Sequence, residues 1–157
     1  MLSENYHVVP LMNSANVSTG SDCDSFNMAG YHKATILFSF GTVTTDITLT
    51  PMSGVTNAAK TTAIPTYYAS GGAVIGTAVA ASTASCDVLA AWTASTTTIT
   101  ISTASNKFTA VEIKASDLSE GHNWVTITVA AGTSGICHAI AILTPRFKTN
   151  RGATCLA

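Results

Sequence analysis

The chain has 157 residues, which is the length of a single domain and enough to bury an apolar core without covalent cross-links. Only 10% of the residues are charged and the formal net charge is -1, which argues against the clustered basic residues of a nucleic-acid-binding protein. Hydrophobic residues make up 46% of the chain, and this excludes intrinsic disorder, because disordered chains combine low hydrophobicity with high net charge.

Residues 1–30 differ in composition from the rest of the chain. Ser, Asn and Gly dominate the segment from Asn13 to Ser25, while Tyr6–Val9 has the composition of a short strand. We interpret residues 1–30 as an N-terminal arm that packs on the domain or on a neighbour, and residues 31–157 as one β domain. Met1–Asn5 is polar and acidic, unlike a secretory signal, so we expect synthesis in the cytoplasm.

The first clear alternation of apolar and polar residues, the pattern of a half-buried strand, spans Lys33–Phe40. A second alternation spans Asp46–Met52. Pro51 predicts that this second strand ends there or runs along a sheet edge, because proline cannot donate to a hydrogen-bond ladder. Thr61–Tyr68 is predicted to be extended, with a break at Pro65.

The longest uncharged stretch runs from residue 61 to residue 86. Its proline, glycines and many hydroxyl residues exclude a membrane-spanning helix. Gly71–Gly72 predicts a turn, Ala73–Val79 is compatible with a strand, and Cys86–Trp92 with a strand or a short helix. So little charge predicts a Thr-rich β protein whose surface is partly covered by other subunits.

Strand patterns are clearest in the second half of the chain. Thr96–Ser102 and Lys107–Lys114 alternate, as does Trp124–Val129 with its valines and isoleucine on one face. Ile136–Leu143 is apolar on both faces, which predicts a central strand covered on both sides. The sequence therefore predicts an all-β, antiparallel jelly roll or β-sandwich of about eight strands, joined by Gly, Asn and Ser turns.

We find no set of residues that predicts an enzyme, a cofactor or a metal site. His138 has the phase of apolar neighbours on its strand, which favours a buried core histidine over a catalytic base. No serine has the G-x-S-x-G surroundings of a hydrolase nucleophile. Asp22 and Asp24 would offer two oxygens to calcium, but a solvated loop is the simpler interpretation of a lone D-x-D pair.

Four cysteines, at positions Cys23, Cys86, Cys137 and Cys155, are widely spaced and contain no C-x-x-C pair. This spacing argues against zinc, whose ligands come in close pairs. In the reducing compartment inferred above we expect buried free thiols rather than disulfides.

Aromatic residues give the only indication of a recognition surface: Tyr67, Tyr68, Trp92 and Trp124. The two tryptophans fall out of phase with the inward residues of their segments, and the two tyrosines follow Pro65 in an uncharged segment. Three interpretations remain open for these side chains, namely packing within the fold, contact between subunits and stacking on a ligand such as a sugar.

A series of strand and turn segments also carries a resemblance to a known family. In chain order these segments are Tyr31–Gly41, Asp46–Thr50, Ala63–Pro65 with Tyr67–Tyr68, Val111–Ile113 with Asp117–Leu118, Trp124–Val129, Ala139–Leu143 and Pro145–Phe147. Over residues 31 to 147 this ordering resembles the small structural proteins of tailed bacteriophages that decorate or cement the capsid. Neither the cysteines nor the first 30 residues belong to the resemblance.

The resemblance implies a jelly-roll or β-sandwich subunit on the capsid surface of the virion, made in the host cytoplasm. Its implied role is to stabilise the shell by bridging subunits of the major capsid protein, as a homotrimer, without binding nucleic acid or membrane. The alternative is a carbohydrate- or receptor-binding β-sandwich module of a phage tail, a fibre or a cell surface. A jelly-roll glycosidase would need two carboxylates across a groove, and nothing in the sequence points to such a pair.

Overall fold

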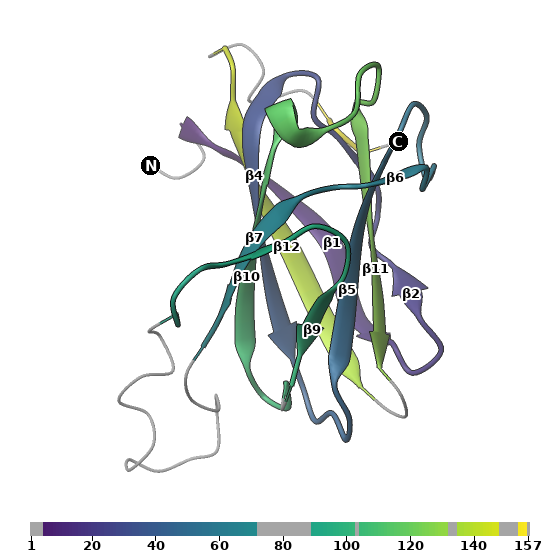
Figure 1. Cartoon of the computed structure of the whole chain (residues 1–157), viewed down its shortest axis with the longest axis vertical. Coiled ribbons are helices and arrows are strands. Elements are labelled where there is room, and N and C mark those ends of the chain that lie inside the picture. Colours follow the sequence, from purple (N-terminus) through teal and green to yellow (C-terminus); the bar gives the residue numbers. More distant parts are fainter. Residues whose placement is uncertain (1–4, 72–88, 103, 132–134, 148–153, 157) are drawn as a thin grey trace.

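The computed structural model describes residues 5–71, 89–102, 104–131, 135–147 and 154–156. Two antiparallel sheets pack face to face, as Figure 1 shows from the edge of the sandwich. In order across it, sheet A contains β1 (His7–Asn16), β12 (Ile136–Pro145), β4 (Tyr31–Phe40), β10 (Phe108–Lys114), β7 (Thr66–Ser70) and β8 (Thr93–Ser95). Sheet B contains β2 (Ser21–Asp22), β11 (Trp124–Ala131), β5 (Ile47–Gly54) and β6 (Thr62–Ala63), while β3 (Phe26–Asn27) pairs with β11 and β9 (Ile99–Ile101) with β5. The predicted all-β sandwich is confirmed.

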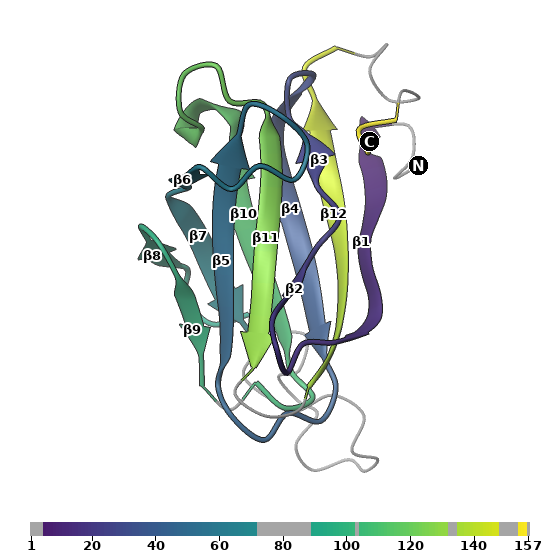
Figure 2. The same cartoon turned by 90° about the vertical axis from the view of Figure 1, so that its right-hand side faces the viewer.

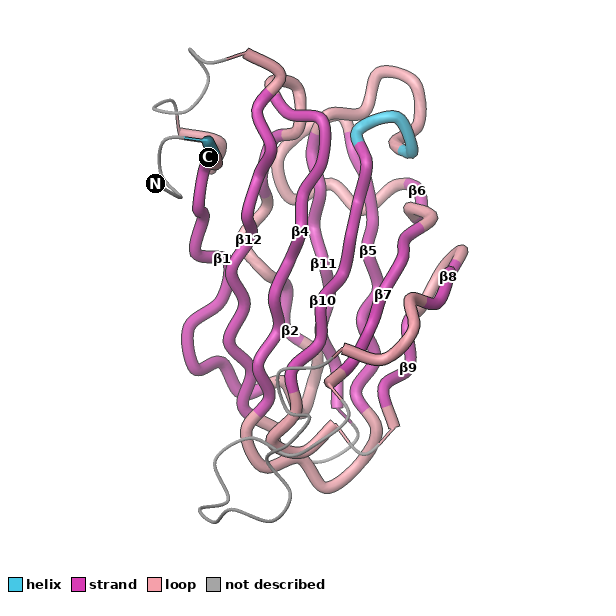
Figure 3. Tube along the Cα trace, turned by 90° about the vertical axis from the view of Figure 1, so that its left-hand side faces the viewer, coloured by secondary structure: helices cyan, strands magenta, loops and turns pink. Residues whose placement is uncertain are grey.

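The pairing of the strands is that of a jelly roll. β1 pairs with β12, β2 with β11, β4 with β10 and β5 with β6. The first described strand therefore pairs with the last, and each further antiparallel pair lies within the previous pair in the sequence. Wrapping this ribbon around the core adds the pairs β12–β4 and β11–β5. β7 and β8 extend sheet A beyond β10. Figures 2 and 3 show sheet B and sheet A, respectively, facing the viewer.

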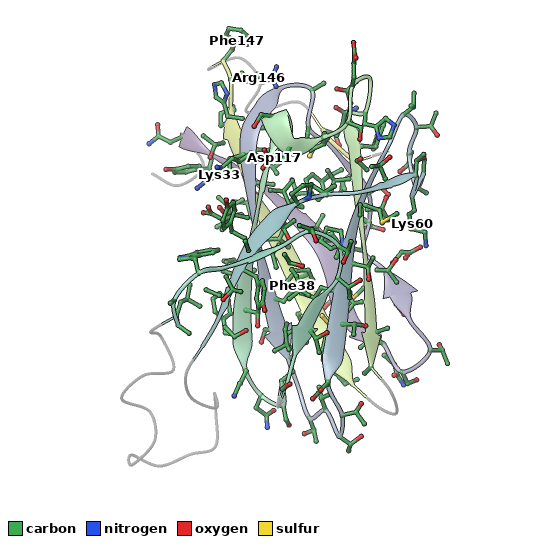
Figure 4. All side chains as sticks on the ribbon, viewed as in Figure 1. Lys33, Phe38, Lys60, Asp117, Arg146 and Phe147 are labelled. Atoms are coloured by element: carbon green, nitrogen blue, oxygen red, sulfur yellow. The ribbon has the colours of Figure 1, made fainter. Side chains whose placement is uncertain are left out.

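The core lies between the sheets and consists of the inward side chains that the alternation predicts. On β4 the even-numbered residues from Ala34 to Phe40 are all buried, and Phe38 stacks on Phe40 with 6.1 Å between ring centroids. Figure 4 shows Phe38 in the space between the ribbons. The valines and isoleucine of β11 are fully buried on the facing sheet. Each fully buried side chain of this size contributes about 1.5–3 kcal/mol relative to exposure to water.

Pro51 does not end its strand, which corrects one prediction. β5 continues to Gly54, and Pro51 is buried opposite Ile127 of β11. The carbonyl oxygen of Pro51 accepts the Ile64 N–H, and in a strand the N and O of one residue face the same edge. The missing N–H of Pro51 therefore faces the side shared by the short strands β6 and β9, where no long ladder is interrupted.

Residues 7–30 pack on the rest of the domain and contribute strands to both sheets. β1 pairs with β12 over most of its length, and Val9 and Leu11 are buried. After β1 the chain crosses to sheet B, where Phe26 and Met28 are fully buried. The polar residues between them occupy turns and the outward face. Two bulges interrupt the alternation of β1 beyond the predicted strand segment Tyr6–Val9.

Some predictions lie outside the described residues. Ala73–Val79 falls there, as do residues 86–88 of the segment Cys86–Trp92, whose remaining residues include the isolated bridge of Leu89 to Gly71 and no helix. Ser105–Asn106 forms a turn, with Asn106 at φ 52°, and Leu118 packs against the core after the short 3-10 helix η2 (Ala115–Asp117). None of the described segments is a helix long and apolar enough to cross a membrane.

Candidate functional site

Two of the four predicted aromatic residues lie close together at one edge of sheet A. Tyr67 on β7 is 44% exposed, and Trp92, directly before the paired strand β8, is 45% exposed. The Lys114 ammonium lies 5.4 Å from the centroid of the Tyr67 ring, a cation–π contact. Both tyrosines lie in a strand, and the half-buried Tyr68 packs against the core.

Trp124 lies elsewhere. It begins β11 in sheet B, where it pairs with Gly54 and Asn27 and is half-buried. The structure therefore does not bring the four aromatic residues into one platform: Trp124 is on the second sheet, Tyr68 is a packing residue, and Tyr67 and Trp92 remain as exposed rings.

A larger surface that the sequence analysis missed lies on the outer side of sheet A. Cross-strand register places Val8 beside Ile142, and Ile140 beside Leu37, so these side chains share one face. Val8, Ile136 and Ile140 are 40%, 41% and 42% exposed, while Leu37 and Ile142 are half-buried. We call these five residues the apolar face. Figure 3 shows the strands that carry it, β1, β12 and β4, side by side.

This finding corrects the prediction that Ile136–Leu143 is covered on both sides. The odd-numbered residues of β12 from Cys137 to Leu143 are buried against sheet B, but the even-numbered residues have no described segment over them. The sequence carried a signal, because Leu37 on β4 breaks the polar phase of its strand at the position opposite Ile140.

His138 projects from the apolar face and is exposed, so the prediction of a buried core histidine is wrong. His138 alternates in phase with Ile136 and Ile140, but these side chains point to the outer side of sheet A and not into the core. The His138 Nδ1 accepts the backbone N–H of Ser14 at 3.3 Å, and the Ser14 Oγ lies 3.1 Å from Nε2. With Nδ1 as acceptor, a neutral ring carries its proton on Nε2, which then donates to Ser14 and cannot activate it as a nucleophile.

Beside His138 the surface has a shallow hollow of about 170 Å³. Its lining consists of Leu37, Ser39, Phe108, His138, Ala139 and Ile140, with apolar atoms predominating. Phe108 pairs in register with Ser39 and extends the apolar surface onto β10. The hollow adjoins the apolar face.

Charged side chains lie at the margins of this surface and are paired. The Lys33 Nζ lies 2.7 Å from Glu112 Oε1, between β4 and β10. On the other sheet, Lys60 Nζ lies 2.8 Å from an Asp22 oxygen. Among the described residues, no three His, Cys, Asp or Glu side chains gather in a way that would hold a metal ion.

The described cysteines are buried free thiols, as predicted: Cys23, Cys137 and Cys155. Burial raises the pKa of Cys137 to about 12 and also raises the pKa of Cys23 and of Cys155. Tyr31, whose hydroxyl lies 2.6 Å from His7 Nδ1, also contacts Cys155. These groups hold the ends of the described chain to β4 and offer no reactive thiolate.

No protein-family model and no curated protein matches the sequence. Among solved structures, the chain is similar to the crystal structure of the SPBc2 prophage-derived protein YomS, with 11% sequence identity and a TM-score of 0.46. The alignment covers 89% of this chain and 94% of that protein. A similarity of this size assigns no function.

Proposed function

We propose that this chain is a phage virion protein that decorates the capsid and stabilises it by bridging subunits of the major capsid protein, as a homotrimer. Two arguments support the proposal. The order of segments from Tyr31 to Phe147 resembles capsid decoration proteins, and the jelly roll leaves an apolar face uncovered. The apolar face is the observation that carries the proposal, because covering it with capsid protein would remove apolar side chains from water.

The composition of the apolar face makes its burial favourable. Contiguous exposed apolar patches on soluble domains mark interaction sites, and each Å² removed from water contributes about 25 cal/mol. Thr35 and Ser39, opposite residues of β12 on this face, bear hydroxyl groups, and His138 lies between Ile136 and Ile140. The nearest ion pair, Lys33–Glu112, lies at the margin and does not have to be desolvated.

The proposed mechanism is mechanical rather than chemical. A subunit that binds across two capsid proteins adds its contacts to those that already hold the shell together. Because many copies act in parallel, a modest binding energy per copy sums to a large increase in the work needed to separate capsid subunits. No proton transfer or covalent step is required.

The experiment compares two charge insertions on opposite sheets. Ile140→Lys places an ammonium in the centre of the apolar face, whereas Thr100→Lys places the same charge on the exposed side of β9 in sheet B. We expect I140K to weaken binding to capsids that lack the protein by about tenfold or more, since central apolar anchors carry most interface energy, and T100K to bind like the wild type. Co-sedimentation with capsids measures both.

Thermal release of DNA from the same capsids tests stabilisation directly. Wild-type protein should raise the bursting temperature, and I140K should not at matched concentration. Equal binding of I140K and wild type, or an unchanged bursting temperature with wild type bound, would contradict the proposal. Sedimentation equilibrium of the free protein tests the trimer. A protein that is monomeric in solution and also on the shell would contradict it.

A second candidate function is supported by the exposed rings of Tyr67 and Trp92. Exposed aromatic rings on neighbouring strands are a common platform for sugars, and the alternative is therefore a carbohydrate- or receptor-binding module. On a glycan array, binding that is lost in both Tyr67→Ala and Trp92→Ala would favour this function over capsid decoration.

A further inference from the structure

A pocket of about 340 Å³ lies on the opposite side of the molecule from the apolar face. Four segments that are distant in the sequence line it: β2 with its connection to β3, the loop after β5, the outer side of β11, and Leu156. Its polar lining residues are Asp22, Asp24, Ser25, Asn57 and Thr126. This volume falls in the range of about 300–1,000 Å³ that is usual for small-molecule sites.

The rim of the pocket is fixed by Asp22. Its carboxylate accepts from Lys60 Nζ at 2.8 and 3.1 Å and from Thr128 Oγ1 at 2.6 Å. Figure 4 labels Lys60 at the side of the sandwich near β2. Because Lys60 neutralises Asp22, the remaining free charge of the pocket belongs to Asp24.

The floor of the pocket contains two buried hydroxyl groups. Ser25 Oγ and Thr126 Oγ1 lie 2.6 Å apart, with their residues 8% and 1% exposed. Ser25 Oγ also accepts the backbone N–H of Ala58 at 3.2 Å. Two hydroxyls carry two protons, and their mutual bond uses one, so the pair retains one O–H donor with no acceptor among the described residues.

The wall of the pocket presents an acceptor and an amide. Within the described part of the chain, neither the carboxylate of Asp24 nor the side-chain amide of Asn57 has a hydrogen-bond partner. Both residues are exposed and hydrated in the free protein, so a ligand can replace that water without first breaking a hydrogen bond within the protein. A ligand that both donates and accepts hydrogen bonds can therefore use the carboxylate, the amide and the buried hydroxyl pair together.

We propose that this pocket binds one ring of a saccharide. Vicinal hydroxyls donate to Asp24, exchange donor and acceptor roles with Asn57, and accept the free proton of the Ser25–Thr126 pair. A guanidinium or ammonium group fits less well, because it has no acceptor for that proton. A divalent cation also fits less well, since Asp22 is already bound to Lys60. The inference is independent of the capsid proposal and uses a different surface from Tyr67 and Trp92.

The test is a titration of ¹⁵N-labelled full-length protein with glucose, galactose, mannose and N-acetylglucosamine, each followed by NMR. We expect at least one sugar to cause saturable shifts in the amide signals of Ser25, Ala58 and Thr126. Asp24→Asn should weaken binding of that sugar by about tenfold or more, since hydrogen bonds to a charged acceptor are stronger than those to a neutral amide. Glu120→Gln, the same charge change on an exposed turn residue, should bind like the wild type.

Further arms separate the competing explanations. Asn57→Ala, at an exposed position, should also weaken sugar binding and serves as the second variant if Asp24→Asn disturbs folding. Y67A and W92A should leave the sugar affinity unchanged. Agmatine, which carries a guanidinium group, and calcium chloride are titrated in the same way. The proposal is overturned if none of the four sugars gives saturable shifts, or if only agmatine or calcium chloride gives them. It is also overturned if binding persists in both pocket variants or is lost in the aromatic ones. None of these results bears on capsid binding by the apolar face.

Discussion

At the scale of single residues, Asp22 shows how one carboxylate joins separate parts of sheet B. Burial alone would raise its pKa, but the hydrogen bonds from Lys60 and Thr128 and the charge of Lys60 outweigh burial, so the pKa of Asp22 is lowered. A carboxyl whose pKa is lowered by folding stabilises the folded state above its unfolded pKa, and this contribution is lost as the pH falls through the folded pKa.

The first prediction concerns Asp22→Asn. Because the pair is well exposed to solvent, we expect D22N to reduce the free energy of unfolding by only about 0–1 kcal/mol at pH 7. Urea denaturation of both proteins at several pH values measures the difference, which should shrink once the pH falls below about 4, the ordinary range of an aspartate. A difference that is constant down to pH 2 would show that the ion pair is not its cause.

At the scale of elements, β1 is defined by the alternation of its two faces. Val9 is buried in the core, whereas its neighbour Val8 is 40% exposed on the apolar face. The two residues have the same side chain in the same strand, paired with adjacent residues of β12. The same substitution at these two positions therefore distinguishes the contribution of β1 to the core from its contribution to the apolar face.

We predict opposite outcomes for aspartate at these two positions. Val9→Asp should destabilise the fold by more than about 3 kcal/mol, because it buries a carboxylate without a partner, while Val8→Asp should change stability by about 0.5 kcal/mol or less. Urea unfolding followed by circular dichroism gives both values. If β1 were a dispensable arm, V9D would be as stable as V8D.

The same alternation explains how much of the fold could be predicted. On β4, β10 and β11 the inward apolar residues recur at every second position, so they could be named from the sequence even though Leu37 and Phe108 interrupt the polar outer face of β4 and β10. β12 is apolar on both faces, and no rule that uses one strand alone can say which face meets the second sheet. β1 is predicted only over Tyr6–Val9, because its bulges near Met12 and Ser14 interrupt the period of two beyond that segment.

The candidate sites depended on information that the sequence does not contain. An exposed aromatic ring is recognisable by its phase, so Tyr67 and Trp92 could be selected in advance. The apolar face required the register of β1, β12 and β4, and the pocket required Asp24, Asn57 and Thr126 to meet from three segments. Only the fold determines such meetings between distant residues.

At the scale of the whole molecule, the buried thiols report on the integrity of the sandwich. Cys23 and Cys137 lie in the core, and Cys155 packs next to Tyr31. A raised pKa leaves little thiolate at neutral pH, and burial excludes reagent, so alkylation requires opening of the fold.

We therefore predict that iodoacetamide modifies Cys23 and Cys137 of the native protein at pH 8 at least about 100-fold more slowly than in urea. Mass spectrometry of peptides, with glutathione in the same tube as an internal reference, measures the rates. Rapid modification of Cys137 in native protein would mean that β12 opens locally or is less buried than described.

The pairing of β1 and β4 with β12 also has a consequence for synthesis on the ribosome. β12 follows every other described strand, yet it fills the gap between β1 and β4 in sheet A. A nascent chain that has been translated only as far as residue 135 therefore presents unpaired edges on β1 and β4 and lacks the buried side chains of β12. Such an intermediate is vulnerable to aggregation and to proteases, and the β1 and β4 edges are paired only after β12 has been translated.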